Sequence, residues 1–537
     1  MRNSVWATRL RTIAWAARFV GALVRNSVWV TRLRTIGLGS RVRRCVVAPT
    51  SDRDPAVARR LDRSGCRSKV GLQPGAVAPA DRRTAPGGRH ARRTAPGAHP
   101  EPRRVQVRVG DADQNGVTAT VEAGAPEESL RFAAGPRPAR RAHLVLLAVL
   151  ILQFVAVGLW QAKHDSVTVD EAVDVATGIT SIVRHDLRMN PEHGPLPKAL
   201  ATLPALLADP IVPDGEAYET AAWFDHTDEF LVANREAGKL DDILFLARLV
   251  PLAIGVGCAL LLHRLGSALF SPVAGVVAAG LWLTTPVFVG FSHFAMIDVP
   301  FTFTVLLLCE CLRRHLVAPS NRTLVALGAA AAAALLTRHL ALALVGVLVV
   351  ALVAAGWRSD RRRALVAGAT VSLVALAGVW LGVRAIAPRP LDGAARATHE
   401  EIVAAASADS LPAKAVAALP WPLEWESGFA YLTLTSDQRP AYLFGQAWEG
   451  SRVWFFPGSL LTKLPLGALA LVLAAPFAWR RLDDERRRLA TLVVLAPAAL
   501  TFALVLLQPL NLGLRLAFPT VALLLVAAGA AATHLVA

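Results

Sequence analysis

Ten apolar runs, most of them about long enough to cross a lipid bilayer, follow one another after residue 141. A helix needs about 20 residues to cross the hydrocarbon core, and only helices or closed barrels satisfy their backbone hydrogen bonds there. The runs are too long and continuous for barrel strands, so they predict an all-α, polytopic membrane helix bundle of about ten spans. The predicted spans lie near 142–162, 244–263, 272–292, 299–317, 323–337, 340–356, 364–386, 456–479, 489–508 and 516–536.

The composition agrees with a membrane protein. Of the 537 residues, 54% are hydrophobic and 18% are charged, whereas soluble proteins are about 45–50% apolar and about 25% charged. This apolar content excludes a disordered chain and argues against an ordinary soluble enzyme.

The charge is unevenly distributed along the chain. Residues 1–143 contain 28 Lys and Arg residues against 10 Asp and Glu, whereas residues 144–537 contain 29 against 30. We predict a basic, mostly disordered N-terminal extension at 1–140, and a membrane domain at 141–537 whose neutrality argues against nucleic-acid binding. The extension is interpreted either as a tail without function or as an arm with a basic amphipathic helix that lies on an anionic membrane surface.

The basic residues that flank the spans predict the orientation of the domain, because cytoplasmic loops carry an excess of Lys and Arg. Every basic cluster falls on one side: Arg137, Arg140 and Arg141, then Arg264, then Arg313, Arg314 and Arg322, then Arg358 and 361–363, then Arg480, Arg481 and 486–488. The expected location is the cell membrane, with the N-terminus in the cytoplasm. The long acidic segments 163–242 and 387–455 are then external, which favours chemistry or recognition at the outer face.

Two adjacent acids, Asp170 and Glu171, follow the first span. Apolar spacing predicts a short amphipathic surface helix over 171–184 and a second over 196–207, and it places Asp170 and Asp174 on one helix face. A carboxylate fixed at the lipid–water boundary is suited to removing a proton from a hydroxyl acceptor. Alternatively, Asp170 only caps the helix and Glu171 occupies its first turn. Spacing alone leaves both interpretations open.

Three more candidates lie on the same predicted side. Glu192 and His193 belong to the Pro-rich turn NPEHGPLP between the two surface helices, and we treat this turn as a candidate loop for binding acceptor or donor. Asp298 stands at the outer entry to the fourth span, where it could share the site or simply cap that helix.

Cations also occur on the side that the charge bias disfavours. Arg338 lies at an outer turn, while Lys463 and Arg515 lie within the outer halves of two spans. A basic residue in an apolar span costs a few kcal/mol unless it reaches water or pairs with an anion. One such residue would be explained by snorkelling, but three together favour an anionic ligand such as a lipid-linked phosphate.

Metal and redox chemistry receive no support from the sequence. Cys309 and Cys311 form a C-x-C inside an apolar run with no His or second Cys pair beside them, so we interpret them as small buried residues. The acidic segments show no ligand spacing typical of a divalent ion. We therefore predict no cofactor and no metal site.

The order of motifs over 142–536 resembles a known group of enzymes. The motifs are VDEAVDVATG, RHDLRMNPEHGPLPKALATLPALL, FAMIDVPFTF, LLTRHLALAL, FGQAWEGSRVWFFPGSLLTKLPL and NLGLRLAFP. Together they resemble the GT-C membrane glycosyltransferases of the protein-O-mannosyltransferase type, which include bacterial family 39-like enzymes and lipid A aminoarabinose transferases. The NPEH-x-PL and WFFP…L-x-K-x-P-L stretches are the most specific parts.

The resemblance implies roles for individual residues. The catalytic Asp of the family matches Asp170, with Glu171 beside it, and Asp298 matches the D-x-P position. Arg338 stands where relatives often place a Lys, whereas Lys463 and Arg515 match basic positions that flank the donor. The implied donor is a sugar on a polyprenyl or dolichyl phosphate used from the outer face. The basic N-terminal extension has no counterpart in the family, and the chain ends directly after a span, so a truncated C-terminus is expected.

The expected activity is that of an inverting glycosyltransferase, which moves a hexosyl, mannosyl or pentosyl group to a hydroxyl of a protein, lipid or polysaccharide. Asp170 would accept the proton, and the cations would stabilise the leaving phosphate. Two alternatives remain at this point. One is a transporter or flippase of a lipid-linked anion, which typically has internal repeats and broken helices. The other is a truncated, inactive relative.

Overall fold

A computed structural model describes residues 137–436 and 439–536 of the chain. The helices that correspond to the predicted spans are α3 (Arg137–His164), α8 (Leu240–Leu269), α9 (Pro272–Thr284), α10 (Pro286–Phe291), α11 (Asp298–Val317), α12 (Asn321–Leu335), α13 (Ala341–Gly356), α14 (Arg361–Ile386), α18 (Phe455–Lys463), α19 (Leu466–Arg480), α20 (Asp484–Ala490), the π-helix η3 (Thr491–Leu495), α21 (Ala496–Leu507), and α22 (Phe518–Val536) after the short 3₁₀ turn η4 (Leu514–Ala517). The predictions for the N-terminal extension fall almost entirely on residues outside this description.

The prediction of an all-α, polytopic membrane bundle is confirmed, and each of the ten predicted spans is helical. In the described part of the chain, five segments are long and apolar enough to cross a bilayer: 141–164, 240–269, 361–386, 484–507 and 514–533. A sixth crossing is formed if α18 and α19, which are bent by 119° at the break between them, count as one broken span. The helices α9, α12 and α13 are apolar but shorter.

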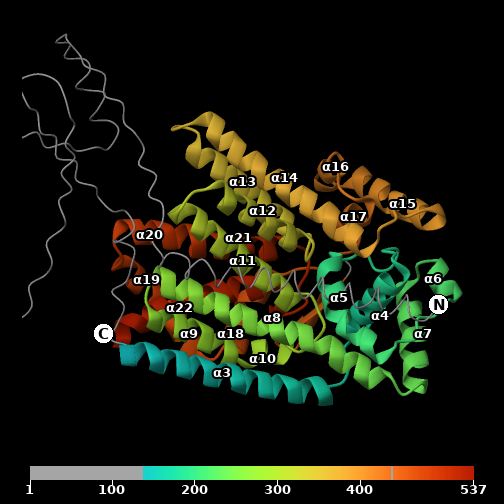
Figure 1. Ribbon diagram of the computed structural model, residues 1–537, viewed down its shortest axis with the longest axis horizontal. Helices are drawn as coiled ribbons and strands as arrows, with labels where there is room; N and C mark the ends of the chain where they lie inside the picture. Colours follow the sequence, from blue (N-terminus) through green and yellow to red (C-terminus); the bar gives the residue numbers. More distant parts are fainter. Residues whose placement is uncertain (1–136, 437–438, 537) are drawn as a thin grey trace, which may run out of the picture. The chain divides into compact units, whose positions relative to one another are not determined.

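The helix α22 forms the centre of the bundle. In its apolar stretch 89% of the residues are buried, whereas only 17% of those in the apolar stretch of α3 are buried. Figure 1 shows α22 among α8, α9, α11 and α19, with α3 along one edge. Small residues allow this close packing: a Cβ atom at Gly529 in α22 would collide with the backbone of Ala274 in α9. Such small contacts are typical of helix association in membranes, where packing replaces the hydrophobic effect.

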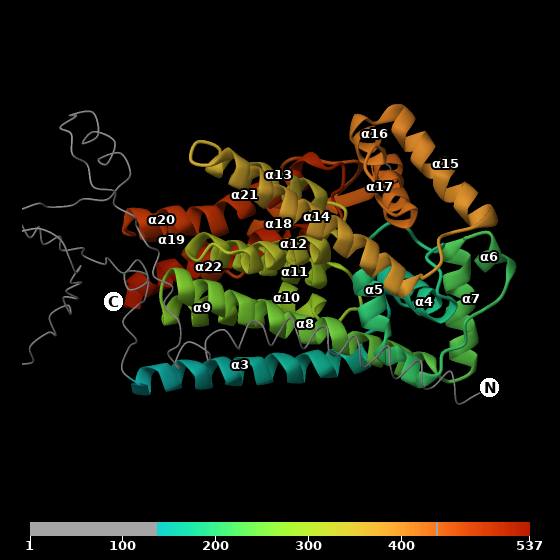
Figure 2. The ribbon, with the colours of Figure 1, turned by 45° about the horizontal axis from the view of Figure 1, so that its top comes forward.

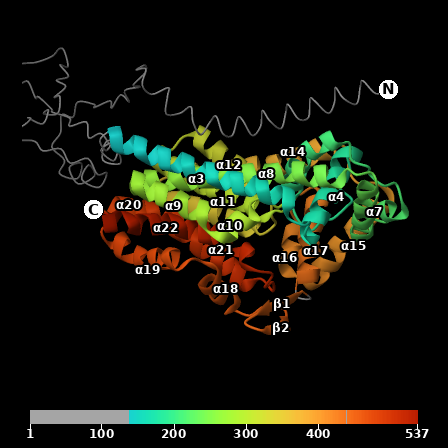
Figure 3. The ribbon, with the colours of Figure 1, turned by 90° about the horizontal axis from the view of Figure 1, so that it is seen from below.

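The two predicted external segments lie together at one end of the bundle (Figures 1 and 2). The first contains α4 (Val169–Arg184), α5 (Pro195–Thr202), the 3₁₀ helix η1 (Pro204–Ala208), α6 (Glu216–Glu219) and α7 (Trp223–Glu236). The second contains α15 (Gly393–Asp409), α16 (Leu411–Ala417), α17 (Leu423–Thr435) and the antiparallel strands β1 (Pro440–Leu443) and β2 (Gln446–Glu449), which lie near α18 in Figure 3.

Both predicted surface helices are present. The first is α4, whose N-cap is Thr168 because its hydroxyl accepts a hydrogen bond from the backbone N–H of Glu171. Asp170 is therefore not the cap. The second is shorter than predicted, since α5 ends at Thr202 and the chain continues as a 3₁₀ helix from Pro204, where proline cannot donate to the helix.

Three of the basic residues that predicted the orientation converge at one buried acid. Arg264 of α8 and Arg313 and Arg314 of α11 all contact the carboxylate of Glu310, which is 1% exposed. Cys309 and Cys311 beside it are buried and free, as predicted.

Candidate active site

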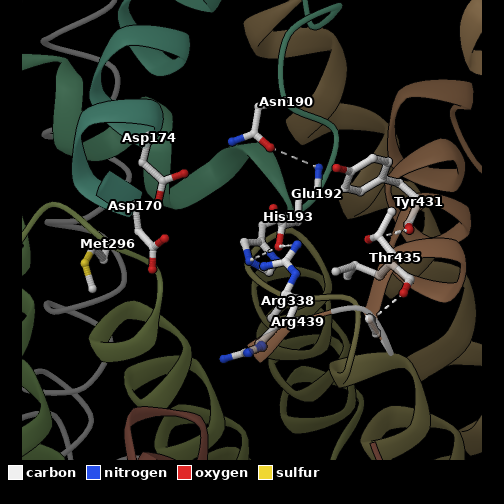
Figure 4. Close-up of polar contacts among 12 residues, drawn as sticks. Asp170, Asp174, Asn190, Glu192, His193, Met296, Arg338, Tyr431, Thr435 and Arg439 are labelled. Atoms are coloured by element: carbon white, nitrogen blue, oxygen red, sulfur yellow. Dashed lines mark hydrogen bonds and ion pairs between the residues drawn. The ribbon is translucent and has the colours of Figure 1, made fainter. Parts of the chain in front are cut away.

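A cavity of about 380 Å³ opens where the external helices meet the ends of the bundle helices. Its walls come from α4, the turn before α5, α7, the start of α11, the turn after α12, α17 and η4. Of the predicted site residues, six line this cavity: Asp170, Glu192, His193, Asp298, Arg338 and Arg515. Figure 4 shows several of these side chains pointing into a common space.

Arg515 links carboxylates that are far apart in the sequence. Its Nη1 lies 2.5 Å from Oδ2 of Asp170 and 3.9 Å from Oδ2 of Asp298. The other oxygen of Asp298 accepts a hydrogen bond of 3.1 Å from Nη1 of Arg338. Two acids and two guanidinium groups thus form one continuous cluster with no net formal charge.

The cluster has a buried and an accessible end. Asp298 and Arg338 are 5% and 6% exposed, whereas the side chain of Asp170 is 51% exposed. Asp298 is the first residue of α11, where the helix dipole favours a carboxylate. A buried ion pair has lost its hydration and depends on its partner, so Asp298 and Arg338 fix the geometry while Asp170 and Arg515 remain reachable from the cavity.

Hydrogen bonds from two aromatic side chains hold the turn that carries Arg338. His339 donates from Nε2 to the carbonyl oxygen of Trp425 at 2.9 Å, and the indole N–H of Trp425 donates to the carbonyl oxygen of Leu335 at 2.9 Å. Burial lowers the pKa of His339 to about 4, so its imidazole is neutral near pH 7. These two hydrogen bonds tie α17 to the turn between α12 and α13.

The Pro-rich turn is attached to the same place. The backbone N–H of Leu196 donates to the carbonyl oxygen of Leu336 at 3.1 Å, and a Cβ atom at Gly194 would collide with that backbone. Oε1 of Glu192 lies 2.5 Å from Nη2 of Arg439 and 3.7 Å from Nε2 of His193. Burial, together with Arg338 and Lys198, lowers the pKa of His193 well below its ordinary value.

A second acid of α4, Asp174, also lines the cavity. It is 6% exposed, and its Oδ1 lies 3.8 Å from Nζ of Lys198 in α5. The same Nζ donates to the carbonyl oxygen of Asn190 at 2.9 Å. Burial raises the pKa of Asp174 to about 7, against the opposing effect of Lys198. The sequence already placed Asp170 and Asp174 on one helix face, but it offered no sign that Asp174 is buried.

Glu171, which was predicted beside Asp170 in the site, does not line the cavity. Its carboxylate is fully buried and accepts two hydrogen bonds from Arg248 of α8, from Nε at 2.8 Å and from Nη2 at 2.7 Å. It also accepts one from the backbone N–H of Ala295 at 3.0 Å. Since residues 170 and 171 are about 100° apart around a helix, neighbouring acids face different surroundings. These contacts attach α4 to the bundle.

Lys463 also lies apart from the cluster. It is the last residue of α18, its side chain is exposed, and it is absent from the cavity lining. A sharp bend follows Lys463, so α18 and α19 do not form the single straight span that the sequence predicted. The structure therefore brings two of the three predicted cations together, but not the third.

Sequence reasoning missed other residues of the cavity wall. Trp223, Phe224, Tyr431 and Arg439 line it from the external segments, and the rings of Trp223 and Tyr431 meet edge to face with centroids 5.4 Å apart. Neither the helix of Trp223 nor that of Tyr431 was predicted, so no pattern pointed to them. Within the described residues, no group of three or more His, Cys, Asp or Glu side chains could hold a metal ion.

Residues 240–381 match the family model described as dolichyl-phosphate-mannose-protein mannosyltransferase. Among solved structures, the chain is similar to ArnT from Cupriavidus metallidurans bound to undecaprenyl phosphate, with 15% identity and a TM-score of 0.45 over 72% of this chain and 59% of that one. It is also similar to the Archaeoglobus fulgidus oligosaccharyltransferase, with 14% identity and a TM-score of 0.42 over 73% and 50%.

A third similar structure is the oligosaccharyltransferase AglB from Archaeoglobus fulgidus in complex with an inhibitory peptide and a dolichol phosphate, with 14% identity and a TM-score of 0.41 over 74% of this chain and 51% of that one. The chain thus spans less than two thirds of each of these proteins. No curated protein matches it. The family match contains Asp298 and Arg338, and the predicted resemblance to the GT-C membrane glycosyltransferases is confirmed.

Proposed function

We propose that this protein is an inverting glycosyltransferase that moves a sugar from a polyprenyl-phosphate donor to an acceptor hydroxyl at the outer face of the cell membrane. The observation that carries the proposal is the cluster of Asp170, Arg515, Asp298 and Arg338 in one cavity. It combines an accessible carboxylate with guanidinium groups, which are the groups that such a transfer needs. The family match over 240–381 supports glycosyl transfer from a lipid-linked donor.

In the proposed reaction, the carboxylate of Asp170, which is half exposed, accepts the proton of the acceptor hydroxyl. General base catalysis requires the base to lie within hydrogen-bond reach of that proton, and the cavity admits a ligand to this carboxylate. The acceptor oxygen then attacks the anomeric carbon from the side opposite the phosphate. One direct displacement of this kind inverts the anomeric configuration.

The guanidinium groups would bind the leaving phosphate. Arginine presents several N–H groups in a plane and binds phosphate oxygens at more than one point. Arg515 contacts its carboxylate partners through Nη1, and its side chain is 18% exposed. Stabilising negative charge as it develops on the leaving group is usually a large contribution to catalysis.

The experiment is sugar transfer by the full chain reconstituted in vesicles. A radiolabelled sugar is offered on undecaprenyl phosphate and on dolichyl phosphate, with protein, lipid and polysaccharide acceptors. Label in a new glycosidic bond supports the proposal, and nuclear magnetic resonance of the product should show an inverted anomeric carbon. Movement of intact donor across the bilayer without a new bond would instead establish a transporter. If neither transfer nor movement is detected, the protein is an inactive relative.

The proposed orientation is tested separately. Cysteines introduced singly at exposed positions of α7 and α20 are labelled with a membrane-impermeant thiol reagent in intact cells. We expect labelling at Asp228→Cys and none at Asp484→Cys, and the reverse pattern would contradict an outward-facing cavity.

A further inference from the structure

Two carboxylates of α4 face the same cavity in different surroundings. Asp170 and Asp174 are one helical turn apart, which separates their Cα atoms by about 6 Å along the axis, and Figure 4 shows both side chains beside one open space. Oδ2 of Asp170 is already engaged by the guanidinium of Arg515 at 2.5 Å. Asp174 has no contact that short with a cation, since Lys198 lies 3.8 Å away.

The ammonium group of Lys198 is shared between Asp174 and the backbone. Lys198 is 7% exposed, and its ammonium group donates to the carbonyl oxygen of Asn190 at 2.9 Å. Three acids also act on Asp174, namely Asp170 on the same helix, Glu192 in the Pro-rich turn and Asp298 of α11. The guanidinium of Arg515 in η4 is a second cation that acts on it. Burial and three acids thus favour the protonated form of Asp174, whereas the cations Lys198 and Arg515 oppose it.

We propose, on the basis of the proposed function, that Asp174 is a further catalytic residue, which takes the acceptor's proton from Asp170 and holds it until the product leaves. Pairs of carboxylates in contrasting environments are a common way to separate ionised and protonated roles in one site. The accessible partner meets the acceptor, and the buried partner keeps the proton away from the leaving phosphate.

The step balances as follows. The acceptor O–H bond breaks, its oxygen bonds to the anomeric carbon, and the bond from that carbon to the phosphate oxygen breaks with its electron pair on the phosphate. The proton passes to the carboxylate of Asp170 and then to that of Asp174, which becomes a neutral carboxylic acid beside the lysine cation. After the product leaves, the proton returns to water through the cavity.

The first test is the pH dependence of transfer at saturating donor. Because the pKa of Asp174 is about 7, its carboxylate is protonated below that pH and cannot accept, so the rate should fall as the pH drops from 8 to 5. Asp174→Asn should lower the rate about 10²-fold or more, which is typical of losing a proton-transfer group, and should remove this inflection. Asp174→Glu should restore the inflection.

Two controls separate this role from a structural one. Asp174→Asn combined with Lys198→Met keeps the net charge of the pair, so a correctly folded double variant with the same loss excludes an effect of the unpaired lysine. Asp228→Asn changes an exposed acid of α7 outside the cavity and should keep the wild-type profile. A wild-type pH profile in Asp174→Asn would overturn the inference.

A second measurement needs no substrate, so it stays informative if the proposed function fails. Infrared difference spectra of the full chain in vesicles should show a protonated carboxyl band that titrates near pH 7 and is absent from Asp174→Asn. A band that persists in the variant would refute the assignment. Failure of sugar transfer by the wild type would count against the proposed function alone.

Discussion

Nη1 of Arg515 lies 2.5 Å from Oδ2 of Asp170, although one residue precedes the last helix and the other follows the first predicted span. Because the same guanidinium lies 3.9 Å from Asp298, it joins the first external segment to the helix bundle. This relationship makes the two ends of the membrane domain parts of one site.

Replacing Asp170 by Asn should abolish transfer without unfolding the protein. The side chain is half exposed and nearly isosteric with its replacement, so the fold loses little, whereas loss of a general base lowers rates by about 10²–10⁴-fold. Activity is measured as the initial rate of transfer. Correct folding is checked by comparing the elution profile of the purified variant in detergent with that of the wild type. Full activity in a folded Asp170→Asn variant would remove this residue from the mechanism.

Replacing Arg338 by Met should destabilise the domain. It leaves Asp298 buried without its hydrogen-bonded partner, and breaking a buried pair costs about 3–5 kcal/mol. Thermal unfolding in detergent should show a clearly lower midpoint. Adding Asp298→Asn should recover most of the stability but none of the activity, because both charges are then missing from the site. Recovery of transfer in the double variant would contradict a functional role for the pair.

Glu171 should prove to be structural. Glu171→Gln leaves the guanidinium of Arg248 in a fully buried position without a counter-charge, which again costs about 3–5 kcal/mol. We expect a lower unfolding midpoint and less folded protein, but a KM for the donor and a pH profile that match the wild type. A selective loss of kcat at unchanged stability would show instead that Glu171 takes part in the reaction.

Lys463 and Arg515 should respond differently to the same replacement. Lys463→Met removes an exposed charge outside the cavity lining and should change the transfer rate by no more than about threefold, as expected when an exposed charge is removed. Arg515→Met removes the guanidinium that bridges Asp170 and Asp298, and the donor KM should rise while kcat falls. Equal losses of transfer in both variants would indicate that Lys463 also binds the donor.

A methyl group at Gly194 should disturb the site through the backbone. Its Cβ would overlap Leu336, so the Pro-rich turn must move away from the turn that carries Arg338. Gly194→Ala should therefore lower both stability and transfer. Gly290→Ala is the matched control, because nothing lies within 4 Å of a Cβ there. Equal behaviour of the two variants would show that the turn tolerates displacement.

The sequence by itself determined the class of fold and most of the candidate site. Apolar runs separated by basic clusters predict a helical membrane bundle whatever the detailed packing, because lipid requires internal backbone hydrogen bonding. Charged residues near span ends stand out against that background, which is why Asp170, Asp298, Arg338 and Arg515 were recognised and are found together.

Only the tertiary structure decided which charges face the cavity. Glu171 is adjacent to Asp170 but points into the bundle toward Arg248, and Asp174 is buried against Lys198. Lys463 ends α18 at the sharp break before α19. Spacing along a helix shows which face carries a side chain, but it does not show which other elements pack against that face. The partners come from helices far apart in the sequence, so burial and pairing follow from long-range packing alone.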